Sequence, residues 1–231
     1  MINTLRNIPI NLRLTSLVIF FSIGLFVVVY SALTVNKQSL LDEKYAQTKY
    51  VVETATGVFS YFHELEQTGQ MSKADAQRFA MEMIKNTRYA ESEYFWINDY
   101  TATVVMHSIN SALDGKDLSN LEDPNGKKLF SEFVAVVKAQ NEGFVDYLWP
   151  KPGSENPVEK ISYVKGFQPW GWIIGSGVYL DDVDAQFQQE AVKLSVISTI
   201  IVLISLLISF LIVRSILLPI GQIQAALHNI S

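Results

Sequence analysis

Cysteine is absent from this sequence, and histidine occurs only three times among 231 residues. A chain without cysteine forms no disulfide and offers no thiolate to a metal, and three scattered histidines are too few to suggest a metal centre. The sequence also lacks the nucleophile-elbow and HExxH motifs of hydrolases. We therefore expect no catalytic residue, no metal and no cofactor, and we do not expect an enzyme.

Acidic residues are missing from both ends of the chain. All 23 Asp and Glu lie between Asp42 and Glu190, whereas the only charged side chains in residues 1–34 and 194–231 are Arg6, Arg13 and Arg214. Residues 35–193 therefore hold 15 Lys and Arg against 23 acids, a net charge of −8, and the flanks bring the whole chain to −5. An acidic domain is repelled by phosphate, so we expect no nucleic-acid partner.

Charge is missing altogether from two long apolar runs. Leu14–Asn36 is 23 residues long and Leu194–Val213 is 20 residues long. At about 1.5 Å per helical residue, each covers a hydrocarbon core of about 30 Å. The first run is also longer than the apolar region of a cleaved signal peptide. Both runs are predicted to be transmembrane helices.

The arginines that flank the two runs predict the orientation. Because positive residues stay on the cytoplasmic side, both ends of the chain are expected inside the cell. The chain is then a multi-pass protein of the cell inner (cytoplasmic) membrane whose central domain is periplasmic or extracellular. The predicted parts are a cytoplasmic N-terminus (1–13), transmembrane helix 1 (14–36), an extracytoplasmic domain (37–193), transmembrane helix 2 (194–213) and a cytoplasmic segment (214–231).

Helices come first in the central domain and most strands come last. Apolar residues recur at helical spacing in residues 37–67, and Ser72 is a typical N-cap for a second helix that ends near Asn86. A short helix is predicted at Leu129–Gln140. Aromatic and β-branched residues predict five strands, Glu93–Asp99, Thr101–His107, Phe144–Trp149, Lys160–Phe167 and Trp170–Tyr179. Their short connections require antiparallel pairing, so we predict an α+β domain with a five-stranded antiparallel sheet.

Side chains alternate between the two faces of a strand, so one face of this sheet is available to line a ligand cavity. Lys165, Arg88 or His107 would hold a carboxylate, tyrosine hydroxyls would orient it, and aromatic rings would shape the cavity. The net charge of −8 leaves open an amine ligand bound by Asp146 or Asp99. The predicted ligand-binding residues are Arg88, Tyr94, Trp96, His107, Tyr147, Trp149, Tyr163 and Lys165.

Several motifs in order resemble a known family. YFWIND, MHSINSALDGKDLSNLEDPNGKKLF, GFVDYLWPKPG and KISYVKGFQPWGWIIGSGVY are similar to the single Cache sensor domain, a PAS-like extracytoplasmic module with a long N-terminal helix. Ser108 departs from the family, which commonly has proline after the histidine of its Met-His-Pro motif. After the second apolar run, Arg214–Ile220 resembles the start of a HAMP linker, with Pro219 at its entrance.

The resemblance implies the input region of a methyl-accepting chemotaxis receptor, of which this chain would be a fragment or a truncated product. Such domains bind short carboxylates such as acetate, propionate, pyruvate or lactate, and displace the second transmembrane helix toward HAMP. We expect a homodimer with residues 37–67 as its contact face, and downstream chemotaxis proteins as partners of a cytoplasmic part. The same input on a histidine kinase or a nucleotide cyclase, an extracytoplasmic enzyme, and a purely structural anchor are the alternatives.

Overall fold

The computed structural model describes residues 10–90 and 93–217. Residues 39–185 form one compact unit, and the outer parts of the two long helices form another. We describe the two units separately. The main elements in chain order are α2 (Ile10–Gln67), α3 (Lys73–Asn86), β1 (Phe95–Asp99), β2 (Val104–His107), α4 (Leu129–Gln140), β3 (Glu142–Pro150), β4 (Pro157–Phe167), β5 (Trp172–Tyr179) and α5 (Leu180–Ile212).

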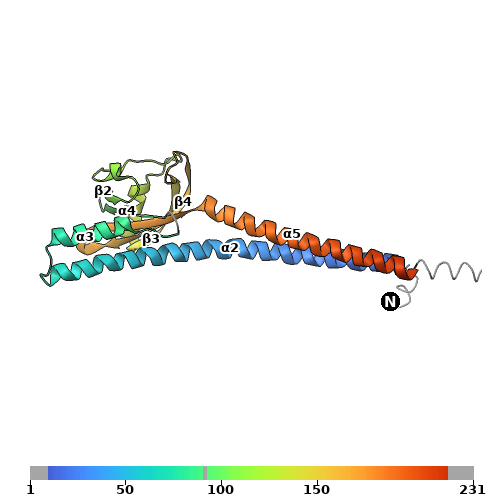
Figure 1. Ribbon diagram of the computed structural model, residues 1–231. Coiled ribbons are helices and arrows are strands. Elements are labelled where there is room, and N and C mark those ends of the chain that lie inside the picture. The colour runs from blue at the N-terminus through green and yellow to red at the C-terminus, as the bar shows by residue number, and fades with distance from the viewer. Residues whose placement is uncertain (1–9, 91–92, 218–231) are drawn as a thin grey trace, which may run out of the picture. The chain divides into compact units, whose positions relative to one another are not determined.

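The five strands form one antiparallel sheet, as the sequence predicted (Figure 1). Their order across the sheet is β2-β1-β5-β4-β3. Three strands begin later than predicted, β1 at Phe95, β2 at Val104 and β5 at Trp172. In the β1–β2 turn, the Asp99 carboxylate accepts hydrogen bonds from the backbone N–H groups of Thr101 and Thr103 at 2.8 and 2.9 Å. An aspartate that binds the backbone two residues on favours a turn over a strand, which explains the late start of β2.

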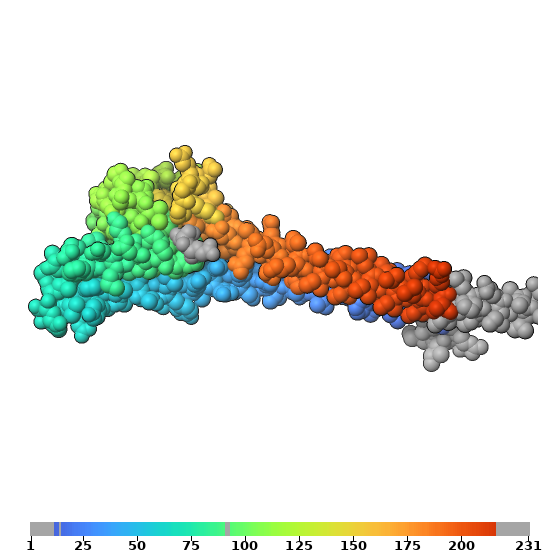
Figure 2. Space-filling model, viewed as in Figure 1, coloured from blue at the N-terminus to red at the C-terminus, as the bar shows by residue number. Residues whose placement is uncertain are grey.

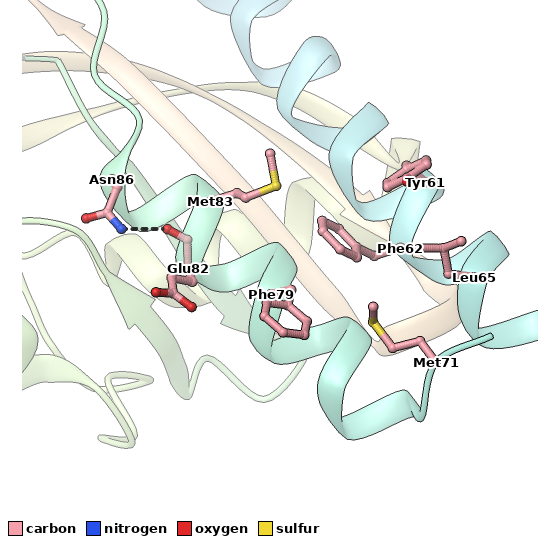
Figure 3. Close-up of a pocket in the computed structure, with 8 residues that line it drawn as sticks. All are labelled: Tyr61, Phe62, Leu65, Met71, Phe79, Glu82, Met83 and Asn86. Carbon is pink, nitrogen blue, oxygen red and sulfur yellow. Dashed lines mark hydrogen bonds between the residues drawn. The ribbon is translucent and has the colours of Figure 1, made fainter. Parts of the chain in front are cut away.

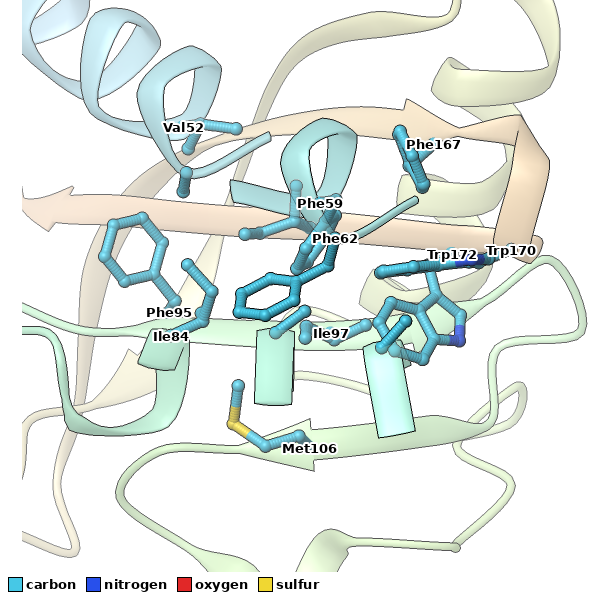
Figure 4. Close-up of a cluster of buried hydrophobic side chains, with 14 of the residues drawn as sticks. Val52, Phe59, Phe62, Ile84, Phe95, Ile97, Met106, Phe167, Trp170 and Trp172 are labelled. Carbon is cyan, nitrogen blue, oxygen red and sulfur yellow. The ribbon is translucent and has the colours of Figure 1, made fainter. Parts of the chain in front are cut away.

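One face of the sheet packs against α2 and α3. Phe59 of α2 is fully buried there, and its ring centroid lies 5.4–5.8 Å from those of Phe167, Trp170 and Trp172 (Figure 4). Helix α3 begins where predicted, because the Ser72 hydroxyl accepts a hydrogen bond from the Asp75 N–H at 3.1 Å. Apolar and aromatic side chains from the two helices and the sheet thus form a hydrophobic core on this face.

The opposite face is covered by α4 and by the segment that leads to it. Helix α4 has the predicted bounds, Leu129–Gln140, and ends at Asn141 in the left-handed conformation, with φ at 66°. Phe133 of α4 packs on the indole of Trp96, with ring centroids 5.1 Å apart. The indole in turn lies directly on Gly175 of β5, where a side chain would overlap the ring. We call this surface the α4 face.

The contact between Gly175 and Trp96 makes a prediction about stability. Gly175→Ala should lower the free energy of unfolding of residues 39–185 by about 1–3 kcal/mol, because an added methyl overpacks the α4 face. Urea unfolding followed by tryptophan fluorescence measures this. In the double variant that also carries Trp96→Leu, the ring that the added methyl contacts is absent. The double variant should therefore lose less stability than the sum of the losses of the two single variants. Additive costs would show that the contact with Trp96 is not the cause.

The two long helices extend beyond this domain. Helix α2 runs through 58 residues without a break, so the predicted first span and the predicted amphipathic helix are one helix. The helical stretches Thr15–Gln67 and Leu180–Ser215 each contain an exposed window long and apolar enough to cross a membrane, with mean hydropathy 2.4 and 3.0. A π-helical turn, Val213–Leu217, follows α5. Of the predicted HAMP start, residues 214–217 belong to this turn, and residues 218–220 lie outside the described residues.

Candidate functional site

Polar side chains gather on the α4 face where β3, β4 and β5 run side by side. Tyr147 of β3 pairs with Lys160 of β4, and Lys160 pairs with Tyr179 of β5. Directly paired residues of antiparallel strands point to the same face, so these three form one row across the sheet. Each is at least nine-tenths buried. The row therefore places an ammonium group between two phenols in the interior of the domain.

Lys160 is the most unusual member of this row, because only 1% of the residue is exposed. Its Nζ lies 4.2 Å from the ring centroid of Tyr94 and 4.4 Å from that of Tyr179, and donates a hydrogen bond to the Tyr179 hydroxyl at 3.3 Å. Within residues 10–90 and 93–217, no carboxylate forms an ion pair with it. Burying a charge is costly unless a counter-charge accompanies it, and cation–π contacts offset only part of that cost.

His107 stands beside this cation as a neutral donor. It is 3% exposed, and its ring centroid lies 5.1 Å from that of Tyr94 and 6.3 Å from that of Trp149. Its Nδ1 accepts the backbone N–H groups of Ile109 and Asn110 at 3.3 and 3.0 Å, which leaves the proton on Nε2. Burial, assisted by Lys160, lowers the pKa of His107 to about 4. The imidazole is thus uncharged at neutral pH, and offers an N–H rather than a positive charge.

Aromatic rings and one hydroxyl pair complete the surroundings of this row. Trp149 lies 6.4 Å from Tyr147 and 6.5 Å from Phe130 between ring centroids. The Tyr147 hydroxyl hydrogen-bonds to Ser162 Oγ at 2.9 Å, and burial raises the pKa of Tyr147 well above its usual value. The phenol therefore stays neutral, and Lys160 is the one buried cation of this group. We call Tyr94, His107, Tyr147, Trp149, Lys160, Ser162 and Tyr179 the Lys160 cluster.

Five of the eight residues predicted to bind a ligand lie on the α4 face: Tyr94, Trp96, His107, Tyr147 and Trp149. Trp96 is engaged in packing, with its Nε1 donating to Asn98 Oδ1 at 3.1 Å. Arg88 lies elsewhere, exposed beyond the end of α3. Its guanidinium donates to the carbonyl oxygens of Lys85, Thr87 and Ser108 at 2.7, 2.8 and 3.1 Å. Arg88 therefore caps a helix end and is not part of the Lys160 cluster.

Tyr163 and Lys165 lie on the other face of the sheet, so their predicted grouping with the residues above is corrected. Tyr163 packs on Phe144 with ring centroids 4.8 Å apart and belongs to the core against α2. Lys165 forms an ion pair with Glu142, and this hydrogen bond lowers the pKa of Glu142 to about 2. The reason is alternation along β4: positions 163 and 165 face α2, whereas 160, 162 and 164 face α4.

Sequence reasoning missed three members of the cluster, Lys160, Ser162 and Tyr179. The signal that could have found them was the register of the β3–β4 hairpin, which pairs Pro150 with Pro157. Counting back from that pair places Lys160 opposite Tyr147, a residue already predicted to bind. Lys160 and Lys165 point to opposite faces of β4, and only the register of the strands shows which of the two lies beside Tyr147.

A small cavity of about 190 Å³ adjoins the cluster and shares Tyr147 and Lys160 with it. Two of its acidic residues, Asp123 and Asp146, already have partners in the protein. The Asp123 carboxylate accepts three backbone N–H groups, including that of Leu148 at 3.0 Å, and Asp146 pairs with Lys127 at 2.8 Å. Asp99 is likewise occupied by the turn between β1 and β2. The acids considered for an amine ligand therefore have protein partners.

A larger groove of about 560 Å³ lies between α2 and α3 (Figure 3). Its walls are apolar, and the hydrogen bond drawn within it is the ordinary helical contact from Asn86 Nδ2 to the Glu82 carbonyl at 3.0 Å. The groove contains no basic side chain. Its lining residues are Tyr61, Phe62, Leu65, Met71, Phe79, Glu82, Met83 and Asn86. For a charged ligand, the Lys160 cluster is the better candidate.

Two curated relatives resemble the chain along most of its length. It is 41% identical over 232 residues to the methyl-accepting chemotaxis protein McpP of Pseudomonas putida, covering 99% of this chain and 42% of the relative. It is 30% identical over 190 residues to the sensor histidine kinase MctS of Rhizobium johnstonii, covering 79% of this chain and 40% of the relative. The chain thus spans about two fifths of the length of these relatives.

Two solved structures each resemble about three fifths of this chain. A periplasmic sensor domain of a chemotaxis protein is 51% identical with a TM-score of 0.60, covering 60% of this chain and 96% of that chain. A Cache chemosensory domain, solved to give the structural basis for carboxylic acid recognition, is 47% identical with a TM-score of 0.59, covering 62% and 97%. Residues 40–193 match the family named Single Cache domain 2. With its antiparallel sheet between two long apolar helices, the chain belongs to the single Cache sensor family.

Proposed function

We propose that the domain is the input region of a transmembrane chemoreceptor and binds a short monocarboxylate at Lys160. The observation that carries this proposal is the buried ammonium of Lys160, which forms no ion pair with any described carboxylate. A ligand carboxylate would supply the missing counter-charge, and a charge-assisted hydrogen bond contributes about 1.5–3 kcal/mol. The Nε2–H of His107 supplies a further donor.

The surroundings favour a small ligand. The adjoining cavity is well below the roughly 300–1,000 Å³ of a pocket for a drug-sized molecule. A six-atom acid has a ceiling of about −9 kcal/mol at about −1.5 kcal/mol per heavy atom, which limits affinity to about the micromolar range. We therefore favour acetate, propionate, pyruvate or lactate. The similar Cache domain studied for carboxylic acid recognition supports this class of ligand.

The structural change that ligand binding would transmit toward the membrane begins at Tyr179. Its hydroxyl accepts the hydrogen bond from Lys160, and the next residue, Leu180, starts α5. Lys151 holds the same helix start through Asp181 and Asp182 at 2.8 and 2.7 Å. A ligand that draws Lys160 away from Tyr179 would change this junction. Helix displacements of about 1–2 Å are typical of such switches. Helix α5 would carry the displacement across the inner membrane to a HAMP linker.

The receptor is also proposed to act as a homodimer, with methyl-accepting chemotaxis partners on its cytoplasmic side. Tyr50 and Tyr61 of α2 are 63% and 58% exposed, and they lie eleven residues apart, which is about three helical turns. A second copy of α2 would bury both rings. Resemblance to the sensor histidine kinase supports one alternative, in which the same non-enzymatic input drives a kinase instead.

A ligand screen tests the proposal. We expect C2–C4 monocarboxylates, and not amines or purines, to raise the unfolding temperature of the chain, because a ligand that binds only the folded state stabilises it by mass action. Calorimetric titration would then give micromolar dissociation constants for the positive compounds. A shift with amines alone would contradict the site, and no shift with any compound would favour a structural anchor or sensing through a partner protein.

A further inference from the structure

Glu93 is a buried carboxylate that the proposed binding site does not use. It lies just before β1, where its backbone N–H and carbonyl form a bridge with Tyr89 at 3.0 and 3.3 Å. The residue is 6% exposed, and its Oε2 has no hydrogen-bond partner among the described residues. A buried carboxylate oxygen without a donor is costly as an anion, and protonation removes that cost.

The charged groups around Glu93 come from segments that are far apart in the sequence. They come from α2, from the β3–β4 loop, from β4 and from the start of α5, and Tyr89 faces Glu93 from its own bridge. None of these charged groups forms an ion pair with Glu93 in the part of the chain that the structure describes. The groups are Lys44, Lys151, Lys160 and Asp182, together with the phenols Tyr89, Tyr147 and Tyr179.

We propose that Glu93 makes protons a second input of this domain, and that it takes up a proton when an anion binds Lys160. Glu93 interacts with the cation of the Lys160 cluster and with Asp182 and Lys151, which meet at the first turn of α5. Its charge therefore acts on the element that leads toward the membrane. Protonation removes a negative charge from that junction, and deprotonation restores it.

Burial raises the pKa of Glu93 to about 7, against the opposing influence of Lys160. Because the pKa of Glu93 is raised, the stability of the fold depends on pH in a definite direction. A carboxyl whose pKa is higher in the folded than in the unfolded chain stabilises the fold at low pH, and this stability falls as pH rises toward 7. His107 has the opposite sign, because its pKa is lowered to about 4 and stability is lost on acidification. The two effects offset one another, so only a comparison of variants separates them.

The link to the ligand rests on the proposed function. A bound carboxylate cancels the field of Lys160, which is the leading influence that keeps Glu93 charged. The pKa of Glu93 then rises further, and near neutral pH the protein takes up part of a proton on binding. Affinity should increase as pH falls from about 8 to 6, by up to about tenfold for each pKa unit of that rise.

Unfolding of the full chain in lipid nanodiscs tests the proton site without any ligand. All four tryptophans lie between residues 96 and 172, so their fluorescence reports on the sensor domain alone. Glu93→Gln should unfold at a higher temperature than wild type at pH 8, and the difference should vanish by pH 5. The matched control is Glu155→Gln, on the exposed β3–β4 loop that protrudes in gold in Figure 2. A difference that is the same at every pH would overturn the proton site.

Calorimetric titration of propionate tests the link and remains informative if Glu93→Gln folds poorly. Wild type is titrated at pH 7.5 in phosphate and in Tris, whose ionisation enthalpies differ. We expect fractional proton uptake in wild type and in Glu155→Gln, and none in Glu93→Gln. Binding of propionate to wild type without proton uptake would overturn the link and leave the proposed function intact. Absence of binding would overturn the proposed function, while the unfolding experiment still decides whether Glu93 binds a proton.

Discussion

Lys160→Met is expected to weaken propionate binding by roughly 10- to 150-fold, which corresponds to the loss of one charge-assisted hydrogen bond of about 1.5–3 kcal/mol. Methionine keeps an unbranched apolar stem between the rings of Tyr94 and Tyr179, so packing is largely preserved. The domain should remain folded, and its stability should be unchanged or higher, because a buried charge without a counter-charge is removed. Calorimetric titration and urea unfolding measure the two effects.

Lys165→Met is the matched control, since it removes the same charge from the same strand on the opposite face. Its ammonium is paired with Glu142, so this variant should lose stability and keep its affinity for propionate. The loss arises because Glu142 keeps only Lys49 as an ion-pair partner, at 3.3 Å, and loses the main cause of its lowered pKa. If both variants lost affinity equally, net charge and not the Lys160 cluster would control binding. If neither did, the site would lie elsewhere.

Phe59→Ala is expected to lower the free energy of unfolding by about 3–5 kcal/mol. The ring is fully buried between α2 and the sheet, and its removal leaves a cavity among Phe167, Trp170 and Trp172. The surroundings of a close-packed core relax only in part around a deleted side chain, so part of this cavity remains. Urea unfolding of residues 39–185, followed by tryptophan fluorescence, measures the loss.

Phe79→Ala supplies the comparison for that variant. Phe79 lies on α3 at the rim of the open groove and is 37% exposed, so its removal should cost clearly less than that of Phe59. An equal cost for the two variants would mean that burial in this core does not determine stability. A cost below about 1 kcal/mol for Phe59→Ala would show that α2 contributes little to holding the sheet.

Local patterns predicted the elements of this fold well. Helix α4 has the bounds that its apolar spacing indicated, and Ser72 caps α3 because a single residue determines that contact. Helix α2 continues without a break across the predicted end of the membrane span at Asn36, because a change of composition need not interrupt a helix. Antiparallel pairing within β1–β2 and β3–β4–β5 followed from their short connections, whereas the pairing of β1 with β5 joins strands that are distant in sequence and was not predicted.

The sequence predicted less well which of the candidate side chains lie on one face, because that depends on register and on which face each strand buries. Alternation divides β4 into two sets of side chains but does not say which set meets α4, so Lys165 was chosen where Lys160 lies. Arg88 shows a second limit, because a basic residue after a helix donates hydrogen bonds to the helix carbonyls as readily as to a ligand. Glu93 could not be singled out at all, since burial of a strand-end carboxylate is a property of the packed domain.

The most direct test of the account is a crystal structure of residues 39–185 with propionate bound. We predict a carboxylate oxygen about 2.7–2.9 Å from Lys160 Nζ, with His107 and the Tyr94 ring beside it. The Lys160 to Tyr179 hydrogen bond, 3.3 Å without ligand, should lengthen or break. Propionate seated against Lys165, in the groove between α2 and α3, or at the Asp146 side chain would contradict the proposed site.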